Sequence, residues 1–299
     1  MQTSPAPSAE APVKSKPAGG IRRWLVLGRV SNLPTVWSNC LAAWLVGGGG
    51  SALRLGIAAL GGSLLYTGGM FLNDAFDAEF DGKHRPERPV PSGAVKRRTV
   101  WICGGALLIA GCAVQLPLGP VPAALALGLA AAIVIYDAVH KHTSAAPVLM
   151  GGCRYLLYLM AAASSEGGLG VLVQWRALAL AAYVCGLSSL AQVESNRGAV
   201  RYWPLALLPA PLLPLLGVSA GKGLAAGVIG LALVVWVGLA LRRALAGADR
   251  NIGAGVARLL AGIVLVDWVG AAAVVPGNGS AFLGLFVLAL LTQRVAPAS

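Results

Sequence analysis

The sequence predicts an all-α membrane protein, a polytopic bundle of nine or ten transmembrane helices. Of its 299 residues, 57% are hydrophobic and only 11% are charged, whereas a soluble domain carries about 25% charged residues. So little charge cannot cover the surface of a soluble fold, and lipid is therefore the expected solvent. The 40 glycines agree with this prediction, because glycine is frequent in membrane helices and lets them pack closely.

Ten segments are candidates for crossing the bilayer, which takes about 20 mostly apolar residues. They lie at 24–47, 52–75, 97–116, 119–139, 147–165, 172–193, 201–217, 223–244, 252–275 and 279–293. The seventh is short and rich in proline, and the last is also short, so we expect nine or ten helices. Residues 1–20 are expected to form a disordered cytoplasmic tail, and residues 21–299 a single transmembrane domain.

The positive charges orient these helices. If the N-terminus is cytoplasmic, every lysine and arginine except Arg54, Arg176 and Lys222 falls on the cytoplasmic side, as the positive-inside rule requires. Topology therefore explains the net charge of +12, and we expect no nucleic-acid partner. The five cysteines lie in apolar stretches without metal-binding spacing, so we interpret them as small buried hydrophobes. We predict a multi-pass protein of the bacterial inner membrane.

The acidic residues also gather on the cytoplasmic face, and the densest group ends the second predicted helix. In a continuous helix, at about 100° per residue, Asp74, Asp77 and Asp81 fall within a sector of about 60°. Glu79 points about 140° away from Asp74. Three carboxylates on one stripe suit Mg²⁺, which often shares its shell with substrate phosphates. We predict these aspartates as catalytic and metal-binding residues, with Asn73 beside them; the alternative is a solvated acidic helix end.

Two arginines follow the acidic stripe in a loop that proline and glycine define. The guanidinium groups of Arg85 and Arg88 can fork onto phosphate oxygens. A metal ion together with arginine can hold a diphosphate and stabilise it as a leaving group. The alternative for each arginine is simple anchoring at the cytoplasmic face.

Two further connections are expected on the same face. Arg154 lies about two turns into the fifth predicted helix, where we expect it to face a carboxylate, a phosphate or the bundle interior. His140 and His142 precede it and are interpreted as loop residues. Glu194, with Asn196, ends the sixth helix and can complete a second cation site; a plain helix end is the alternative.

The order of these residues resembles a known family. The string Asn73-Asp74-x-x-Asp77-x-x-x-Asp81, followed by Arg85-Pro-x-Arg88-Pro-Val-Pro-Ser-Gly93, resembles the first signature of the UbiA superfamily of intramembrane prenyltransferases. Two shorter strings, Arg29-x-Ser31-Asn32-Leu-Pro34 and Tyr136-x-x-x-His140-Lys141, resemble the family's N-terminal region and its Tyr…Lys segment. The resemblance extends over most of the chain.

This resemblance implies a helical fold around a central cavity. It also implies Mg²⁺-dependent transfer of an isoprenoid chain from a prenyl diphosphate to a small hydrophobic or aromatic acceptor. In these terms the predicted metal ligands are Asp74, Asp77, Asp81 and Glu194. The predicted substrate-binding residues are Asn73, Arg85, Arg88, Lys141, Tyr136 and Arg154. The aromatic rings of Trp37, Tyr136, Tyr155 and Tyr158 are candidates for stabilising a carbocation-like carbon; packing is the alternative role.

The second signature departs from the family pattern. Where the family has Asp-x-x-x-Asp, this chain has Glu194-Ser-Asn-Arg-Gly198 and lacks the second carboxylate. This leaves open a lipid-binding relative with altered or lost catalysis. A membrane transporter is the alternative from another class, because the proline-rich segment and Asp267, buried within a span, would serve it.

Overall fold

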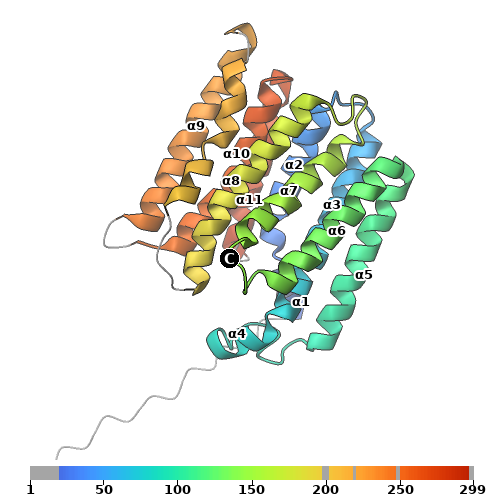
Figure 1. The fold of residues 1–299 in the computed structure, drawn as a ribbon, viewed down its shortest axis with the longest axis vertical. Helices are drawn as coiled ribbons and strands as arrows, with labels where there is room; N and C mark the ends of the chain where they lie inside the picture. The colour runs from blue at the N-terminus through green and yellow to red at the C-terminus, as the bar shows by residue number, and fades with distance from the viewer. Residues whose placement is uncertain (1–19, 197–201, 218–219, 247–249, 296–299) are drawn as a thin grey trace, which may run out of the picture.

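The computed structural model describes residues 20–196, 202–217, 220–246 and 250–295, which form helices joined by loops and contain no strand (Figure 1). The predicted cytoplasmic tail lies outside them, except for Gly20. The α-helices are α1 (Gly20–Leu27), α2 (Leu33–Val46), α3 (Ala52–Phe76), α4 (Ala78–His84), α5 (Arg97–Gln115), α6 (Pro120–Val139), α7 (Ala146–Ala162), α8 (Val171–Asn196), α9 (Ala220–Leu245), α10 (Ile252–Ala272) and α11 (Gly279–Val295). Short 3-10 helices are η1 (Val30–Asn32), η2 (Leu116–Leu118), η3 (Trp203–Leu207), η4 (Ala210–Gly217) and η5 (Pro276–Asn278).

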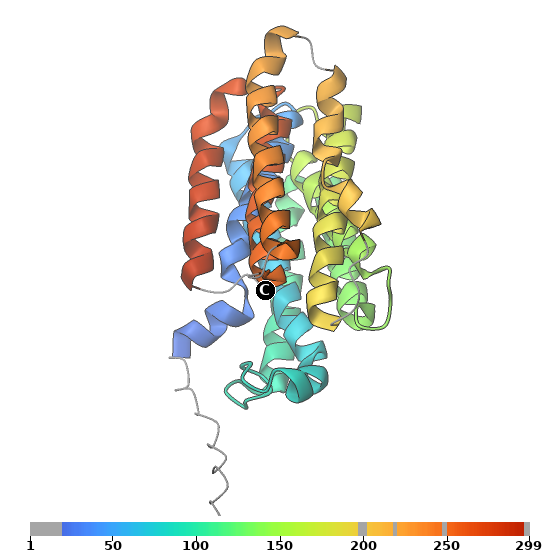
Figure 2. The ribbon, with the colours of Figure 1, turned by 90° about the vertical axis from the view of Figure 1, so that its left-hand side faces the viewer.

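The long helices run side by side, and α10 lies at the centre of the bundle. It packs against α2, α8, α9 and α11, and most of its residues are buried. The two short helices α1 and α4 both lie at the lower end of the bundle, apart from one another (Figures 1 and 2). The segment that joins α3 to α4 therefore lies at this end, which carries the acidic stripe.

Six helices of the described chain are long and apolar enough to cross a membrane, namely α3, α5, α6, α8, α9 and α10. Three further apolar helices, at Ala146–Ala162, Trp203–Leu215 and Gly279–Arg294, are shorter. These helices support an integral membrane protein. The count of nine or ten crossings stays a prediction.

Close helix packing explains part of the glycine content. Helices α3 and α5 approach so closely that a Cβ added at Gly68 would lie 2.9 Å from the carbonyl oxygen of Gly104. One added at Gly111 would lie 3.1 Å from the carbonyl oxygen of Gly61. Small residues at such contacts let two backbones meet, as in other membrane bundles.

The first predicted helix, 24–47, is wrong as a single element. Helix α1 ends at Leu27, and α2 begins only at Leu33. Between them Arg29 adopts the left-handed conformation with φ of 41°, which an uninterrupted helix excludes. The structure therefore brings Arg29 to the end of the bundle where α3 and α4 meet.

The seventh predicted segment, 201–217, is expected to be short and kinked, and the structure has no α-helix in its described part. Its described residues form the two 3-10 helices η3 and η4. Proline removes a backbone N–H and clashes with the preceding turn, and Pro204, Pro209, Pro211 and Pro214 interrupt this segment. The segment is apolar but cannot continue as an α-helix.

Candidate active site

The acidic segment keeps helical spacing although the helix is interrupted. Helix α3 ends at Phe76 and α4 begins at Ala78, but Asp77 N–H donates to the Asn73 carbonyl (2.9 Å) and Asp81 N–H donates to the Asp77 carbonyl (2.8 Å). The three aspartates consequently share one face, and all three are buried. The side chain of Glu79 is 86% exposed. This geometry matches the predicted spacing, and the chemical role of the aspartates stays a prediction.

Two arginines neutralise Asp74 and Asp81. Arg88 Nη1 lies 2.8 Å from Asp81 Oδ2 and 3.7 Å from Asp74 Oδ1. Arg29 Nη2 lies 3.7 Å from the same oxygen of Asp74. Because the aspartates repel one another at close range, these cations hold the acidic face together.

Asp77 has different partners, both from the segment after α6. Its Oδ2 lies 3.1 Å from Lys141 Nζ, and its Oδ1 lies 3.3 Å from His140 Nε2. Burial alone would raise the pKa of Asp77, but the hydrogen bonds and positive charges of His140 and Lys141 outweigh it, so its pKa lies below the usual value. Asp77 is therefore ionised at neutral pH.

Asn73 connects the acidic segment to two other elements. Its Oδ1 accepts a hydrogen bond from Arg29 Nη2 (3.3 Å), and its Nδ2 donates to Asp137 Oδ1 in α6 (3.0 Å). Asp137 is 3% exposed. The amide of Asn73 is thus held between a cation and a buried carboxylate.

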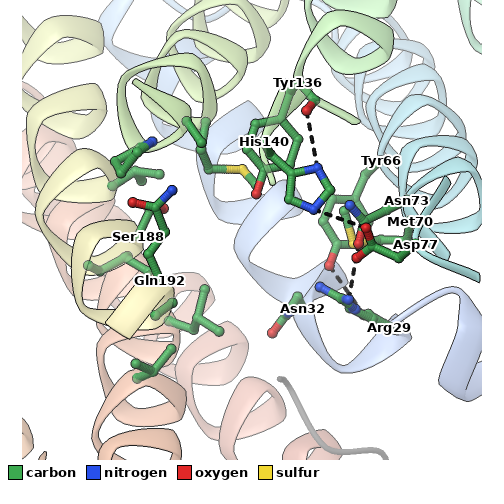
Figure 3. Close-up of a pocket in the computed structure, with 18 of the residues that line it drawn as sticks. Arg29, Asn32, Tyr66, Met70, Asn73, Asp77, Tyr136, His140, Ser188 and Gln192 are labelled. Atoms are coloured by element: carbon green, nitrogen blue, oxygen red, sulfur yellow. Dashed lines mark hydrogen bonds and ion pairs between the residues drawn. The ribbon is translucent and has the colours of Figure 1, made fainter. Parts of the chain in front are cut away.

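A cavity of about 450 Å³ opens beside these residues (Figure 3). The basic residues of its lining include Arg29, Arg85, Arg88, His140 and Lys141. The apolar residues of its lining include Met70, Met150, Val184, Leu187, Leu260 and Ile263. Figure 3 shows Asp77, Asn73 and Arg29 on one side, with Ser188 and Gln192 of α8 facing them. The arrangement suits a molecule with a polyanionic head and an apolar body.

All six predicted substrate-binding residues line this cavity, namely Asn73, Arg85, Arg88, Tyr136, Lys141 and Arg154. Of the predicted metal ligands, Asp77 lines it, whereas Asp74 and Asp81 lie behind Arg88 and Arg29. Helix α8 extends through Glu194, but the side chain of Glu194 lies outside the described part of the structure.

Of the four aromatic candidates, only Tyr136 lines the described cavity. The indole of Trp37 donates to Ser63 Oγ (2.9 Å), and Tyr158 lines a separate, smaller cavity with Asp267. Tyr66 of α3 lines the main cavity instead, and sequence reasoning missed it because nothing in its helix marks it.

Arg29 and His140 are further site residues that sequence reasoning did not select. Arg29 belongs to the string Arg29-x-Ser31-Asn32-Leu-Pro34, and the resemblance of that string to the family's N-terminal region could have identified Arg29 as a site residue. His140 lies in the turn after α6, as the loop interpretation expects, and it also lines the cavity and contacts Asp77. Its neighbour Lys141, which is predicted to bind substrate, also lines the cavity, and its role stays a prediction.

The aspartates fit a divalent cation by their donor chemistry. Asp74 Oδ1 and Asp81 Oδ1 are buried and have no hydrogen-bond partner among the described residues, and Mg²⁺ prefers such carboxylate oxygens. No three His, Cys, Asp or Glu side chains of the described chain are close enough to hold a metal by themselves. Any Mg²⁺ would therefore need oxygens from the substrate or from water as well.

The model of the UbiA prenyltransferase family matches residues 31–259. The chain belongs to the UbiA prenyltransferase family. The match covers most of the chain, as the resemblance of its first signature predicted.

Named relatives match over parts of their length. A digeranylgeranylglyceryl phosphate synthase of Methanoregula boonei is 32% identical over 126 residues, which are 42% of this chain and 44% of the relative. A 4-hydroxybenzoate octaprenyltransferase of Paracidovorax citrulli is 28% identical over 167 residues, 55% of this chain and 52% of the relative. The chain spans about half the length of these relatives.

Solved structures share the fold. A UbiA homolog from Archaeoglobus fulgidus, bound to GPP and Mg²⁺, superposes with a TM-score of 0.60 at 16% identity and covers 84% of this chain and 99% of that one. A structure of digeranylgeranylglyceryl phosphate synthase gives the same TM-score at 18% identity, over 84% of this chain and 98% of that one. At this identity the likeness concerns the fold alone.

Proposed function

We propose that this UbiA-family protein transfers an isoprenoid chain from a prenyl diphosphate to a lipid-soluble or aromatic acceptor and releases diphosphate. The observation that carries the proposal is the mixed lining of the cavity, which combines four cationic side chains and His140 with Asp77, Asn73 and a set of apolar side chains. A diphosphate matches the basic residues and an isoprenoid chain matches the apolar residues. The names of the relatives support this activity.

The basic residues of the cavity would bind the diphosphate and stabilise its charge as it leaves. Arg85 and Arg88 can fork onto phosphate oxygens, and Lys141 and His140 add donors from the opposite element. As the allylic C–O bond breaks, the developing negative charge falls on oxygens that these donors already face. The ring of Tyr136 lies where it can stabilise the positive carbon through a cation–π contact.

The apolar wall would protect the reacting carbon. Water would quench a carbocation-like centre before the acceptor's nucleophile attacks it, so the chain must exclude water from that position. Met70, Met150 and Leu260 are suited to this task.

Mg²⁺ is part of the proposal, with Asp74, Asp77, Asp81 and Glu194 as its ligands. When bound, it would withdraw charge from the diphosphate and so make it a better leaving group. Arg88, which pairs with Asp81, would then be available to a phosphate oxygen. The Archaeoglobus fulgidus homolog holds GPP together with Mg²⁺, which supports this part.

The position of the site in the membrane is proposed from the distribution of lysine and arginine along the chain. We place the site at the cytoplasmic face of the bacterial inner membrane, because the positive-inside rule assigns the loop that follows α4 to the cytoplasm. The proposal includes nine or ten crossings, with the shorter apolar helices α7 and α11 among them.

The test is an assay of the purified full-length protein with a panel of prenyl diphosphates and acceptors, read by mass spectrometry. The proposal expects a prenylated product and an equal amount of diphosphate, both dependent on Mg²⁺. Binding of a prenyl diphosphate without any product would favour the lipid-binding relative. Ion-coupled uptake into liposomes without turnover would favour a transporter.

A further inference from the structure

Arg176 of α8 is a buried cation that neither the main cavity nor the charge asymmetry explains. It is 5% exposed and does not line the main cavity, and the positive-inside rule leaves it among three exceptions on the outer side. Its Nε and Nη1 are buried and have no hydrogen-bond partner among the described residues. Buried donors of a cation are costly without an acceptor, so this guanidinium requires a polar partner.

One carboxylate oxygen of Asp267 in α10 is in the same condition. Asp267 is 2% exposed, and its Oδ2 accepts hydrogen bonds from Asn39 Nδ2 (2.6 Å) and Ser38 Oγ (2.5 Å). Its Oδ1 is also buried, but no described residue donates a hydrogen bond to it. Oδ2 is therefore fully engaged, whereas Oδ1 requires a donor.

Both side chains line one small cavity, whose wall also includes Tyr158, Leu180 and Gly270. Arg176 Nε, Arg176 Nη1 and Asp267 Oδ1 have no hydrogen-bond partner in the described chain, so the two side chains are not bonded to each other directly. The cavity has a volume of about 10 Å³, which is close to the roughly 10–15 Å³ that one water molecule needs. This space is too small for a phosphate or an organic ligand.

We propose that one water molecule binds in this cavity and bridges Arg176 and Asp267. The water accepts a hydrogen bond from the guanidinium and donates one to Asp267 Oδ1. These two charged partners meet the requirement of a buried water, which typically makes about two to four hydrogen bonds. The alternative is a direct ion pair between the two side chains. This inference does not depend on the proposed function.

The bridge extends a relay of hydrogen bonds to the main cavity. Arg154 of α7 lines that cavity and is 8% exposed, and its Nη1 donates to Asn39 Oδ1 (2.7 Å). Because Asn39 donates in turn to Asp267, this relay runs from Arg154 in α7 through α2 to Asp267 in α10. The water continues it to Arg176 in α8, so that one carboxylate is the counter-ion of two buried arginines.

A shared counter-ion makes both arginines depend energetically on Asp267. Removing one partner of a buried ion pair leaves an uncompensated charge, which is strongly destabilising. Substitutions within one hydrogen-bonded network have non-additive effects on stability, whereas those at independent sites add. An Arg176 that belongs to the network and an isolated Arg176 therefore predict different results in a double-mutant cycle.

The first experiment is this double-mutant cycle on the purified full-length protein in detergent, measured as melting temperature. Its variants are Arg176→Met, which keeps an apolar side chain, Asp267→Asn, and their combination. We expect each single substitution to lower the melting temperature by roughly 5 °C, and the combination to lower it no further than the larger single effect. Binding of an unreactive prenyl thiolodiphosphate with unchanged affinity, measured by calorimetry, shows that Arg176→Met is folded.

Arg54→Met combined with Asp267→Asn is the matched control. Arg54 is another exception to the positive-inside rule, but its Nε donates to the Ser164 carbonyl oxygen (2.9 Å) and its Nη2 donates to the Leu118 carbonyl oxygen (2.9 Å). The effects of this pair should add, because Arg54 shares no partner with Asp267.

A crystal structure of the wild type distinguishes the water from a direct contact. We expect electron density for one water molecule within hydrogen-bond distance of Arg176 and of Asp267 Oδ1, at a resolution that shows ordered waters elsewhere in the protein. Three results would overturn the inference: no density at this position, a direct ion pair between the two side chains, or effects in the cycle that add as they do in the control. The structure keeps the inference testable even if Asp267→Asn does not fold.

Discussion

Asp77 shows how the surroundings of a single residue set its charge. A buried carboxylate is normally protonated more easily, yet here His140 and Lys141 reverse that tendency and lower its pKa. Because the pKa in the folded protein lies below the usual 3.8, the ionised carboxylate stabilises the fold above that pH. This stabilisation is lost as the pH falls through the pKa of the folded state.

The pH dependence of stability tests whether the ionised Asp77 stabilises the fold. We expect the melting temperature of the wild type to exceed that of Asp77→Leu at pH 5 to 7, and the difference to shrink as the pH falls below about 4. Thermal unfolding in detergent at a series of pH values measures it. A difference that is the same at pH 3 and pH 7 would show that the ion pairs do not stabilise the fold.

Asp137 is predicted to act through Asn73. Removing the side-chain oxygens in Asp137→Ala leaves Asn73 Nδ2 without its acceptor, and a buried donor left without a partner costs about 1–3 kcal/mol. We expect kcat/KM for prenyl transfer to fall by roughly tenfold or more, at about 1.4 kcal/mol per factor of ten.

The control for this prediction is Asp137→Asn, whose side-chain oxygen can still accept from Asn73. It should restore most of the activity. If Asp137→Asn and Asp137→Ala lose equal activity, the charge of Asp137 matters and the hydrogen bond does not.

At the scale of the elements, the contact between α3 and α5 depends on glycines, which have no side chain. A Cβ at Gly68 meets the backbone oxygen of Gly104 at 2.9 Å, and backbone cannot move aside cheaply. Gly105, one residue further along α5, has open space around it. Gly68 and Gly105 therefore form a matched pair of glycines for testing the contact between α3 and α5.

We expect Gly68→Ala to destabilise the protein by about 1–3 kcal/mol, the usual cost of overpacking. Gly105→Ala should be neutral or should stabilise by up to about 1 kcal/mol, because alanine is the better helix former. The melting temperatures of both variants in detergent measure this. Equal effects would mean that α3 and α5 do not pack as closely as described.

The element boundaries show which parts of the fold the sequence can predict. Hydropathy and charge asymmetry located the long helices well, because each of these helices must match the bilayer thickness by itself. They missed the interruption at Gly28–Asn32, where Arg29 is left-handed, whereas the prolines of 201–217 indicated the interruption of that segment. Apolar composition reports burial in lipid and does not report the backbone path.

At the scale of the whole molecule, the site combines residues from distant parts of the chain. The acidic stripe was predictable because its spacing is local and lies within one segment. The partners of the stripe were harder to predict, because Arg29 and His140 meet Asp74 and Asp77 only through the packing of separate helices. The relay from Arg154 to Asp267 likewise joins three helices, and no local pattern encodes it.

The central claim is that the buried face of the acidic segment is the chemical centre. The most direct measurement compares Mg²⁺-dependent prenyl transfer in four variants: Asp74→Ala, Asp77→Ala, Asp81→Ala and Glu79→Ala. Calorimetric binding of the prenyl thiolodiphosphate and melting temperatures are recorded alongside, so that unfolded variants are recognised.

We predict that each of the three aspartate variants loses its activity while Glu79→Ala remains close to the wild type. Glu79 is exposed and pairs with Arg97 outside the cavity, so its removal leaves the buried face intact. Equal loss of activity in all four variants, or full activity in folded Asp77→Ala, would contradict the account.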